Sequence, residues 1–201
     1  MNRLGRQSAH DRFWDWFQRN AERLLHFEAE QEALFAELSA ELMRVHKGLT
    51  FELGPLQHGQ REFILSADGI RKRLSVVQAL VDAAPPLPGW KITAFRQRKS
   101  LDLRIRLGES ELGADDIWFA SQTEGQQTGL RLYIRGLGEA NRREMLQLAF
   151  ILLDCALGEY DVATRVGSIE FHPLPPDPAA RDLRPLPELR ELFPSFRPVS
   201  G

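Results

Sequence analysis

Two segments near the middle of the chain alternate strictly between apolar and polar residues. Residues 101–107 read Leu-Asp-Leu-Arg-Ile-Arg-Leu, and residues 130–135 read Leu-Arg-Leu-Tyr-Ile-Arg. Because successive side chains of a strand point to opposite faces, each segment would present one apolar and one polar face. This pattern is typical of antiparallel strands that bury one face and leave the other open. The polar face would carry Arg104, Arg106, Arg131, Tyr133 and Arg135.

The same patterning divides the rest of the chain into helices and strands. Apolar residues that recur every three or four positions predict helices at 9–27, 29–47, 70–84 and 140–157. Short runs rich in β-branched and aromatic residues predict strands at 49–53, 61–67, 90–96, 101–107, 116–122, 130–135 and 166–172. The resulting order is ααββαββββαβ. We therefore expect an α+β fold, with helices on one face of a mainly antiparallel sheet of about five to seven strands.

A chain of 201 residues fits one domain, which we expect at residues 1–172. Most of the prolines lie further on, between Pro173 and Pro198, so residues 173–201 are predicted to form an extended tail. The tail also carries large apolar side chains, namely Leu186, Leu189, Leu192, Phe193 and Phe196. These side chains predict that the tail docks on the domain, because a free linker would leave them exposed to water.

The composition is that of a soluble globular protein. With 26 basic and 28 acidic residues the net charge is −2, which disfavours nucleic acid as a partner. No apolar run is long enough to cross a membrane, and the first residues contain no signal peptide, so we expect a cytoplasmic location without membrane contact. The single cysteine excludes an internal disulfide and a metal site built from several thiolates.

Motifs that would bind a cofactor or a metal are absent from the sequence. The chain has no Gly-x-Gly-x-x-Gly, no Gly-x-x-x-x-Gly-Lys followed by Ser or Thr, no His-Glu-x-x-His and no Gly-x-Ser-x-Gly. No two of its five histidines are three or four residues apart, which is the spacing of metal ligands on a helix. The sequence therefore predicts no cofactor and no metal, and it identifies no reaction.

The first predicted helix contains four aromatic residues in five positions, Phe13-Trp14-Asp15-Trp16-Phe17. One helical face cannot bury all four, because neighbouring positions point in different directions. We expect Phe13, Trp16 and Phe17 in the core. Trp14 lies off that face, so either two sides of the helix are buried or Trp14 lines a pocket or a partner surface, where tryptophan is enriched.

Several short motifs are similar to those of one protein family. They are the aromatic opening of the first helix, Ser66-Ala67-Asp68-Gly69 at the end of a strand, Trp90 with Ala94-Phe95-Arg96, and Leu157-Gly158-Glu159-Tyr160-Asp161 followed by Ile169-Glu170-Phe171. On these residues the chain resembles a family of uncharacterised bacterial proteins, over roughly Phe13 to Pro173. The resemblance implies no activity and therefore assigns no catalytic role to any position.

An acid-rich region near the C-terminus offers one functional hypothesis. Glu159, Asp161, Glu170 and His172 lie near one another in the sequence, and the last two share a strand face. If they converge, they could serve a small hydrolase as general acid and base, or bind a metal through oxygen. The polar face of an edge strand has a similar composition, so a structural role is the alternative.

The arginines offer a second hypothesis, which we favour. If the two alternating strands belong to one sheet, at least five cations and Tyr133 share a surface that could bind another protein or an anionic ligand. A solvated face whose arginines pair with nearby acids is the alternative. We therefore expect a non-catalytic binding or protein-interaction module. Its candidate residues are Arg96, Arg98, Arg104, Arg106, Arg131, Tyr133, Arg135 and Trp14.

Overall fold

The computed structural model describes residues 8–194, which form six α-helices and nine strands. The fold class is α+β, as predicted, and most of the strand pairs in this range are antiparallel. Contacts group the chain into two compact units, Met1–Phe95 and Arg96–Gly201. Folding as one domain stays a prediction, because a grouping by contacts does not measure cooperativity. Within residues 8–194, no helix combines the length and the apolar composition that crossing a membrane requires.

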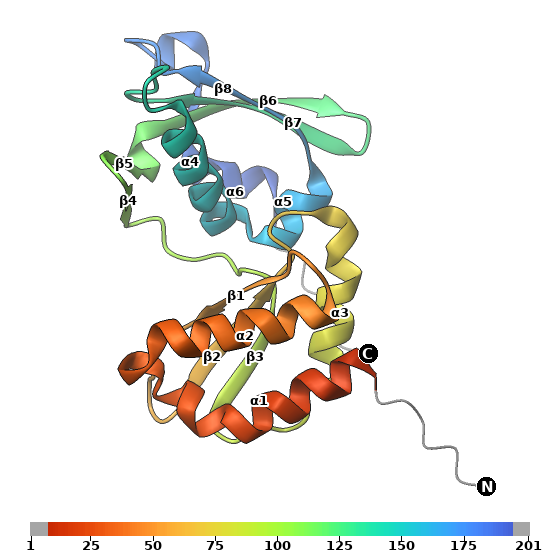
Figure 1. Ribbon diagram of the computed structural model, residues 1–201. Helices are drawn as coiled ribbons and strands as arrows, with labels where there is room; N and C mark the ends of the chain where they lie inside the picture. Colours follow the sequence, from red (N-terminus) through yellow and green to blue (C-terminus); the bar gives the residue numbers. More distant parts are fainter. Residues whose placement is uncertain (1–7, 195–201) are drawn as a thin grey trace, which may run out of the picture. The chain divides into compact units, whose positions relative to one another are not determined.

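The first unit packs helices against a three-stranded sheet (Figure 1). Its helices are α1 (Ala9–Leu25), α2 (Gln31–Val45) and α3 (Leu74–Asp82). Its strands are β1 (Thr50–Leu53), β2 (Arg61–Ser66) and β3 (Trp90–Ala94). β1 runs antiparallel to β2, whereas β3 runs parallel to β2 because α3 carries the chain back along the sheet.

The aromatic residues of α1 form the core of the first unit. A capping box between Ser8 and Asp11 fixes the start of the helix. Phe13, Trp14 and Phe17 are buried, and the Trp14 indole N–H donates a hydrogen bond to the Leu80 carbonyl of α3 at 2.8 Å. The expectation that Trp16 lies in the core is therefore wrong, and of the two alternatives for Trp14 the structure shows the buried one. Trp16 is only partly buried, since Trp14 is the one that satisfies its polar N–H inside the core.

The buried Arg61 of β2 connects the end of α1 with the end of β1. Arg61 is 1% exposed, and its guanidinium donates to the carbonyls of Leu25 at 3.0 Å and Gly54 at 2.7 Å and to the carboxylate of Glu28. It also lies over the Phe27 ring at 4.4 Å. A buried charge is tolerated only when its donors are satisfied, so Arg61 is a structural residue.

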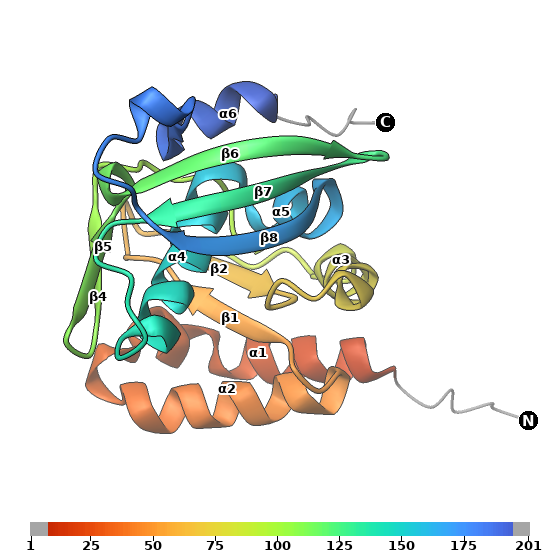
Figure 2. The same ribbon diagram turned by 90° about the horizontal axis from the view of Figure 1, so that it is seen from above.

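The second unit contains a four-stranded sheet, a separate two-stranded hairpin and three helices (Figures 1 and 2). Its strands are β4 (Arg104–Leu107), β5 (Ser110–Gly113), β6 (Ile117–Glu124), β7 (Gln127–Ile134), β8 (Val166–Pro173) and β9 (Arg184–Pro185). Its helices are α4 (Arg142–Leu157), α5 (Glu159–Arg165) and α6 (Leu189–Leu192). The four strands are ordered β8-β7-β6-β9, with β8 parallel to β7 and the other pairs antiparallel.

The two alternating segments do not share a sheet, contrary to the expectation. The chain turns at Gly108, whose φ of +59° suits glycine, and β4 pairs with β5 in a hairpin of its own. The second segment becomes β7, which pairs with β6 and β8. β5 was not predicted from the sequence, and it takes up the hydrogen bonds of β4.

The core of the second unit lies between the sheet and α4. Phe119 and Leu132 point from β6 and β7 into a cluster that includes Leu148 and Leu152 of α4. The segment after β8 contributes to the same cluster through Leu186, Leu189 and Phe193. The proline-rich segment up to residue 194 is therefore part of this core, and Phe196 lies outside the described residues.

A carboxylate at the tip of the β6–β7 hairpin holds the start of β8. Glu124 lies across the sheet, where an added Cβ on Gly129 or Gly167 would collide with its carboxylate oxygens. These oxygens accept hydrogen bonds from the N–H of Ser168 at 2.9 Å and from its hydroxyl. The two glycines therefore leave space for the Glu124 side chain. Through this side chain β6 fixes the register of β8, although the two strands do not pair.

We expect Phe17→Ala to lower the free energy of unfolding by about 3–5 kcal/mol, because Phe17 is fully buried and its removal leaves a cavity. The ring stacks on Phe63 at 4.8 Å and packs edge-on against Trp90 at 5.0 Å. Urea denaturation followed by tryptophan fluorescence measures the change. Trp16→Ala on the same helix is the control and should cost clearly less; equal costs would contradict this packing.

Leu189→Ala should cost about 2–5 kcal/mol, since Leu189 is fully buried in the core of the second unit. Leu192, three residues further along α6, is 38% exposed, and Leu192→Ala should cost less than about 1 kcal/mol. Chemical denaturation of both variants measures the difference. If Leu189→Ala were as stable as Leu192→Ala, the segment would not be docked.

Candidate functional site

Two predicted site residues anchor the start of the second unit. The Arg96 backbone N–H donates to the Glu159 carboxylate at 3.1 Å, and its side chain lies 3.6 Å from Asp154. The Arg98 guanidinium donates to Asp161 and to the Phe193 carbonyl, both at 2.7 Å. Arg98 is also bonded to the Leu157 carbonyl at 2.8 Å. Both side chains are largely buried and tie together segments that are distant in sequence.

Three further candidates belong to one ion-pair network around the β4–β5 hairpin. Arg104 pairs with Glu111, Asp115 and Asp116, Arg106 pairs with Glu111, and Arg135 pairs with Asp116. The hydrogen bonds with Glu111 and Asp116 raise the pKa of Arg104, and those from Arg106 and Arg104 lower the pKa of Glu111. Three cations thus meet three carboxylates, so the network presents no net charge to a ligand.

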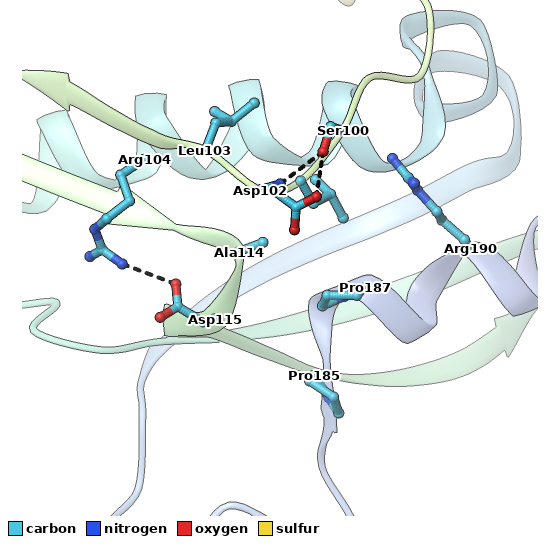
Figure 3. Close-up of a pocket in the computed structure, with 10 residues that line it drawn as sticks. Ser100, Asp102, Leu103, Arg104, Ala114, Asp115, Pro185, Pro187 and Arg190 are labelled. Atoms are coloured by element: carbon cyan, nitrogen blue, oxygen red, sulfur yellow. Dashed lines mark hydrogen bonds and ion pairs between the residues drawn. The ribbon is translucent and has the colours of Figure 1, made fainter.

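A pocket of about 650 Å³ lies beside this network (Figure 3). Its lining residues are Ser100, Leu101, Asp102, Leu103, Arg104, Ala114, Asp115, Pro185, Pro187 and Arg190. The Ser100 hydroxyl donates to Asp102 at 2.9 Å, and Arg190 donates to the carbonyls of Ala156 at 3.0 Å, Cys155 at 3.1 Å and Lys99. Both arginines of the pocket are thus engaged by protein acceptors, which leaves an anion few unused donors.

Several ring-bearing side chains lie on the face of the four-stranded sheet that points away from α4. This face is here named the outer face. Figure 2 shows this face in front of α4 and α5. Pro185, Trp118, Tyr133 and His172 are neighbours in register across β9, β6, β7 and β8. The Tyr133 and His172 rings stack with centroids 5.2 Å apart. The three aromatic rings and the Pro185 ring at their end are here named the aromatic row, and all four side chains are partly buried.

Arg131 lies next to the aromatic row and is exposed. It lies two residues before Tyr133 on the same face of β7, with Ala120 and Glu170 as its neighbours in register. Within residues 8–194 its side chain makes neither an ion pair nor a hydrogen bond, because the Glu170 carboxylate lies 3.2 Å from His172 Nε2 instead. Arg131 is therefore the predicted arginine whose guanidinium is available to a ligand.

The four residues of the hydrolase hypothesis fall into separate pairs. Glu159 is fully buried and accepts the Arg96 N–H, while Asp161 is buried against Arg98. Glu170 and His172 lie on the outer face of β8. Among residues 8–194 no group of three or more His, Cys, Asp or Glu side chains could hold a metal ion. The structure therefore adds no observation that favours this hypothesis.

Two members of the aromatic row were not predicted from the sequence, and Trp14 takes the buried one of its two alternatives. Trp118 stands between Ile117 and Phe119, and three large apolar residues in a row conceal the alternation of β6. Pro185 belongs to a strand of two residues, too short to show a pattern. Trp14, a predicted surface candidate, lies in the core of the first unit. Comparison with known protein families, curated proteins and solved structures finds no match.

Stability should fall in acid in a way that depends on Glu124. Hydrogen bonds from the Ser168 N–H and hydroxyl and from Gln122 lower the pKa of Glu124 from 4.5 to about 2. The folded state thus favours the carboxylate, and its contribution to stability is present above pH 4.5 and is lost as the pH falls toward 2. Glu124→Gln should flatten this loss in melting curves. Glu109→Gln is the control and should leave the wild-type pH dependence in place.

Proposed function

We propose that the chain is a non-catalytic binding module that recognises another protein through the outer face of its four-stranded sheet. One observation carries the proposal: the aromatic row lies beside Arg131, whose guanidinium is not neutralised within residues 8–194. Rings that are only partly buried keep area for contact, and aromatic and arginine side chains contribute most of the energy at protein interfaces.

The chemistry of the partner follows from Arg131 and from the aromatic row beside it. Arg131 can donate a pair of hydrogen bonds to a carboxylate, and the rings of Trp118 and Tyr133 offer apolar faces next to it. The partner should therefore present a Glu or Asp beside an aromatic or apolar side chain. A polyanion fits less well, because Arg104, Arg106 and Arg135 are already paired with carboxylates.

A peptide titration tests the proposal on the full chain. The probes are a synthetic peptide of alternating Glu and Tyr, a matched peptide of alternating Lys and Tyr, and polyuridine RNA. We expect the Glu-Tyr peptide to shift the NMR signals of Trp118, Tyr133 and His172, and the Lys-Tyr peptide to bind more weakly. Arg131→Ala should weaken binding of the Glu-Tyr peptide by up to about five-fold, the value of an exposed ion pair.

Arg106→Ala is the matched control, since Arg106 is exposed but already paired with Glu111, and its removal should leave the affinity unchanged. Shifts confined to the pocket in Figure 3, or no shift with either peptide, would overturn the proposal. Binding of polyuridine that weakens steeply with salt would assign the outer face to nucleic acid instead.

A further inference from the structure

The two edges of the four-stranded sheet differ in how they are protected. On one edge, β9 covers part of β6 with two residues, one of them Pro185, and the uncovered end of β6 is polar from Ser121 to Glu124. On the other edge, the eight residues of β8 pair on one side only within the described chain. Proteins usually shorten or charge such an edge, because its unpaired backbone groups can join another strand.

The direction of the backbone groups of β8 follows from two hydrogen bonds. The Leu174 N–H donates to the Ile134 carbonyl of β7 at 2.9 Å, and the Ser168 N–H donates to Glu124, which reaches over β7. Backbone groups alternate along a strand, so the N–H groups of Ile169 and Phe171 point to the open edge. The open edge is therefore equipped to pair with a further strand.

Apolar rings flank the open edge on the face that carries α4. The Phe150 ring of α4 packs edge-on against Phe171 of β8, with centroids 5.3 Å apart. Phe150 is 44% exposed and its neighbour Ile151 is 40% exposed. A strand added to β8 would cover Phe171 and bring its own side chains against Phe150, which would remove apolar surface from water.

We infer that β8 pairs antiparallel with β8 of a second copy of this chain and joins the two sheets into one. Phe171 would then lie opposite its own copy as a hydrogen-bonded pair, with both N–H groups at the junction satisfied. In this register Glu170 faces His172 of the other copy, twice by symmetry. The alternative register that places Ile169 opposite Phe171 also places Glu170 against Glu170, which like charges disfavour.

The complementary charges of β8 favour a second copy of this chain as the partner at the open edge. One face of the strand offers Glu170 and His172, which lie 3.2 Å apart within the chain. An antiparallel meeting of two copies also places each of them opposite its counterpart in the other copy. Pro173 would lie opposite Ile169 and accept its N–H through the carbonyl, while the missing proline N–H leaves the Ile169 carbonyl without a donor, so the ladder ends at this pair. This dimer does not depend on the partner proposed for the outer face.

Sedimentation velocity of the full chain over a range of concentrations tests the inference, with two substitutions at one position. His172→Glu places like charges against Glu170 of the other copy, and His172→Lys places opposite charges there. We expect a dimer whose dissociation constant rises by about 2- to 30-fold in His172→Glu, for two cross-strand pairs, and does not rise in His172→Lys. Arg106→Ala, in the separate β4–β5 sheet, is the control and should leave the dimer unchanged.

Cysteine cross-linking tests the register separately. Glu170→Cys and His172→Cys proteins, mixed in equal amounts and mildly oxidised, should form a disulfide, because positions 170 and 172 face each other across the junction. Neither variant alone should cross-link. A monomer at every concentration would overturn the inference, as would a dimer that His172→Glu leaves intact or that cross-links within each single variant.

Discussion

The register of the β6–β7 hairpin is the constraint on which the second unit depends. It pairs Ile117 with Ile134 at one end and Glu124 with Gln127 at the other, closed by a turn in which Gly125 has a φ of +63°. Since side chains alternate along both strands, this register sends Phe119 and Leu132 toward α4 and Trp118 and Tyr133 to the outer face. A slip by one residue would exchange the core for the candidate contact surface.

Carboxylates at the two ends of this hairpin hold the neighbouring elements and determine which arginine stays without an ion pair. Asp116 precedes β6 and binds Arg104 and Arg135, which fastens the β4–β5 hairpin to the sheet. Glu124 ends β6 and binds Ser168, which fastens β8. Arg131 lies between these two ends, and within residues 8–194 it pairs with neither carboxylate. The same contacts that stabilise the fold therefore neutralise the arginines at the base of the hairpin and leave the one in its middle available.

The predictable features were those that depend on residues near one another in sequence. Alternation at residues 130–135 correctly placed Arg131 and Tyr133 opposite the core, and the helical pattern predicted all of the longer helices. Pairing could not be predicted, because a glycine turn at Gly108 and a four-residue strand decide it and neither has a distinctive pattern. The same holds for the choice between the two alternatives for Trp14, which depends on the carbonyl of Leu80, 66 positions away. For the same reason the predicted arginines do not form one surface. Acids from η3 (Ala114–Asp116) and β5 contact Arg104 only after folding.

Pairing of β8 with a second copy would change what the outer face can bind. With Glu170 opposite His172 of the other copy, the aromatic row of one chain continues in register into Glu170 and then Arg131 of the other. Each row would thus end at a guanidinium supplied by the second chain, in addition to the Arg131 of its own strand. The two Arg131 side chains would be about 16 Å apart across the junction, because three strand spacings separate them in one direction and two residues along the strand in the other. A partner with two acidic positions at that separation would engage both at once, and its affinity would exceed that of a single contact because the second contact forms within the same complex.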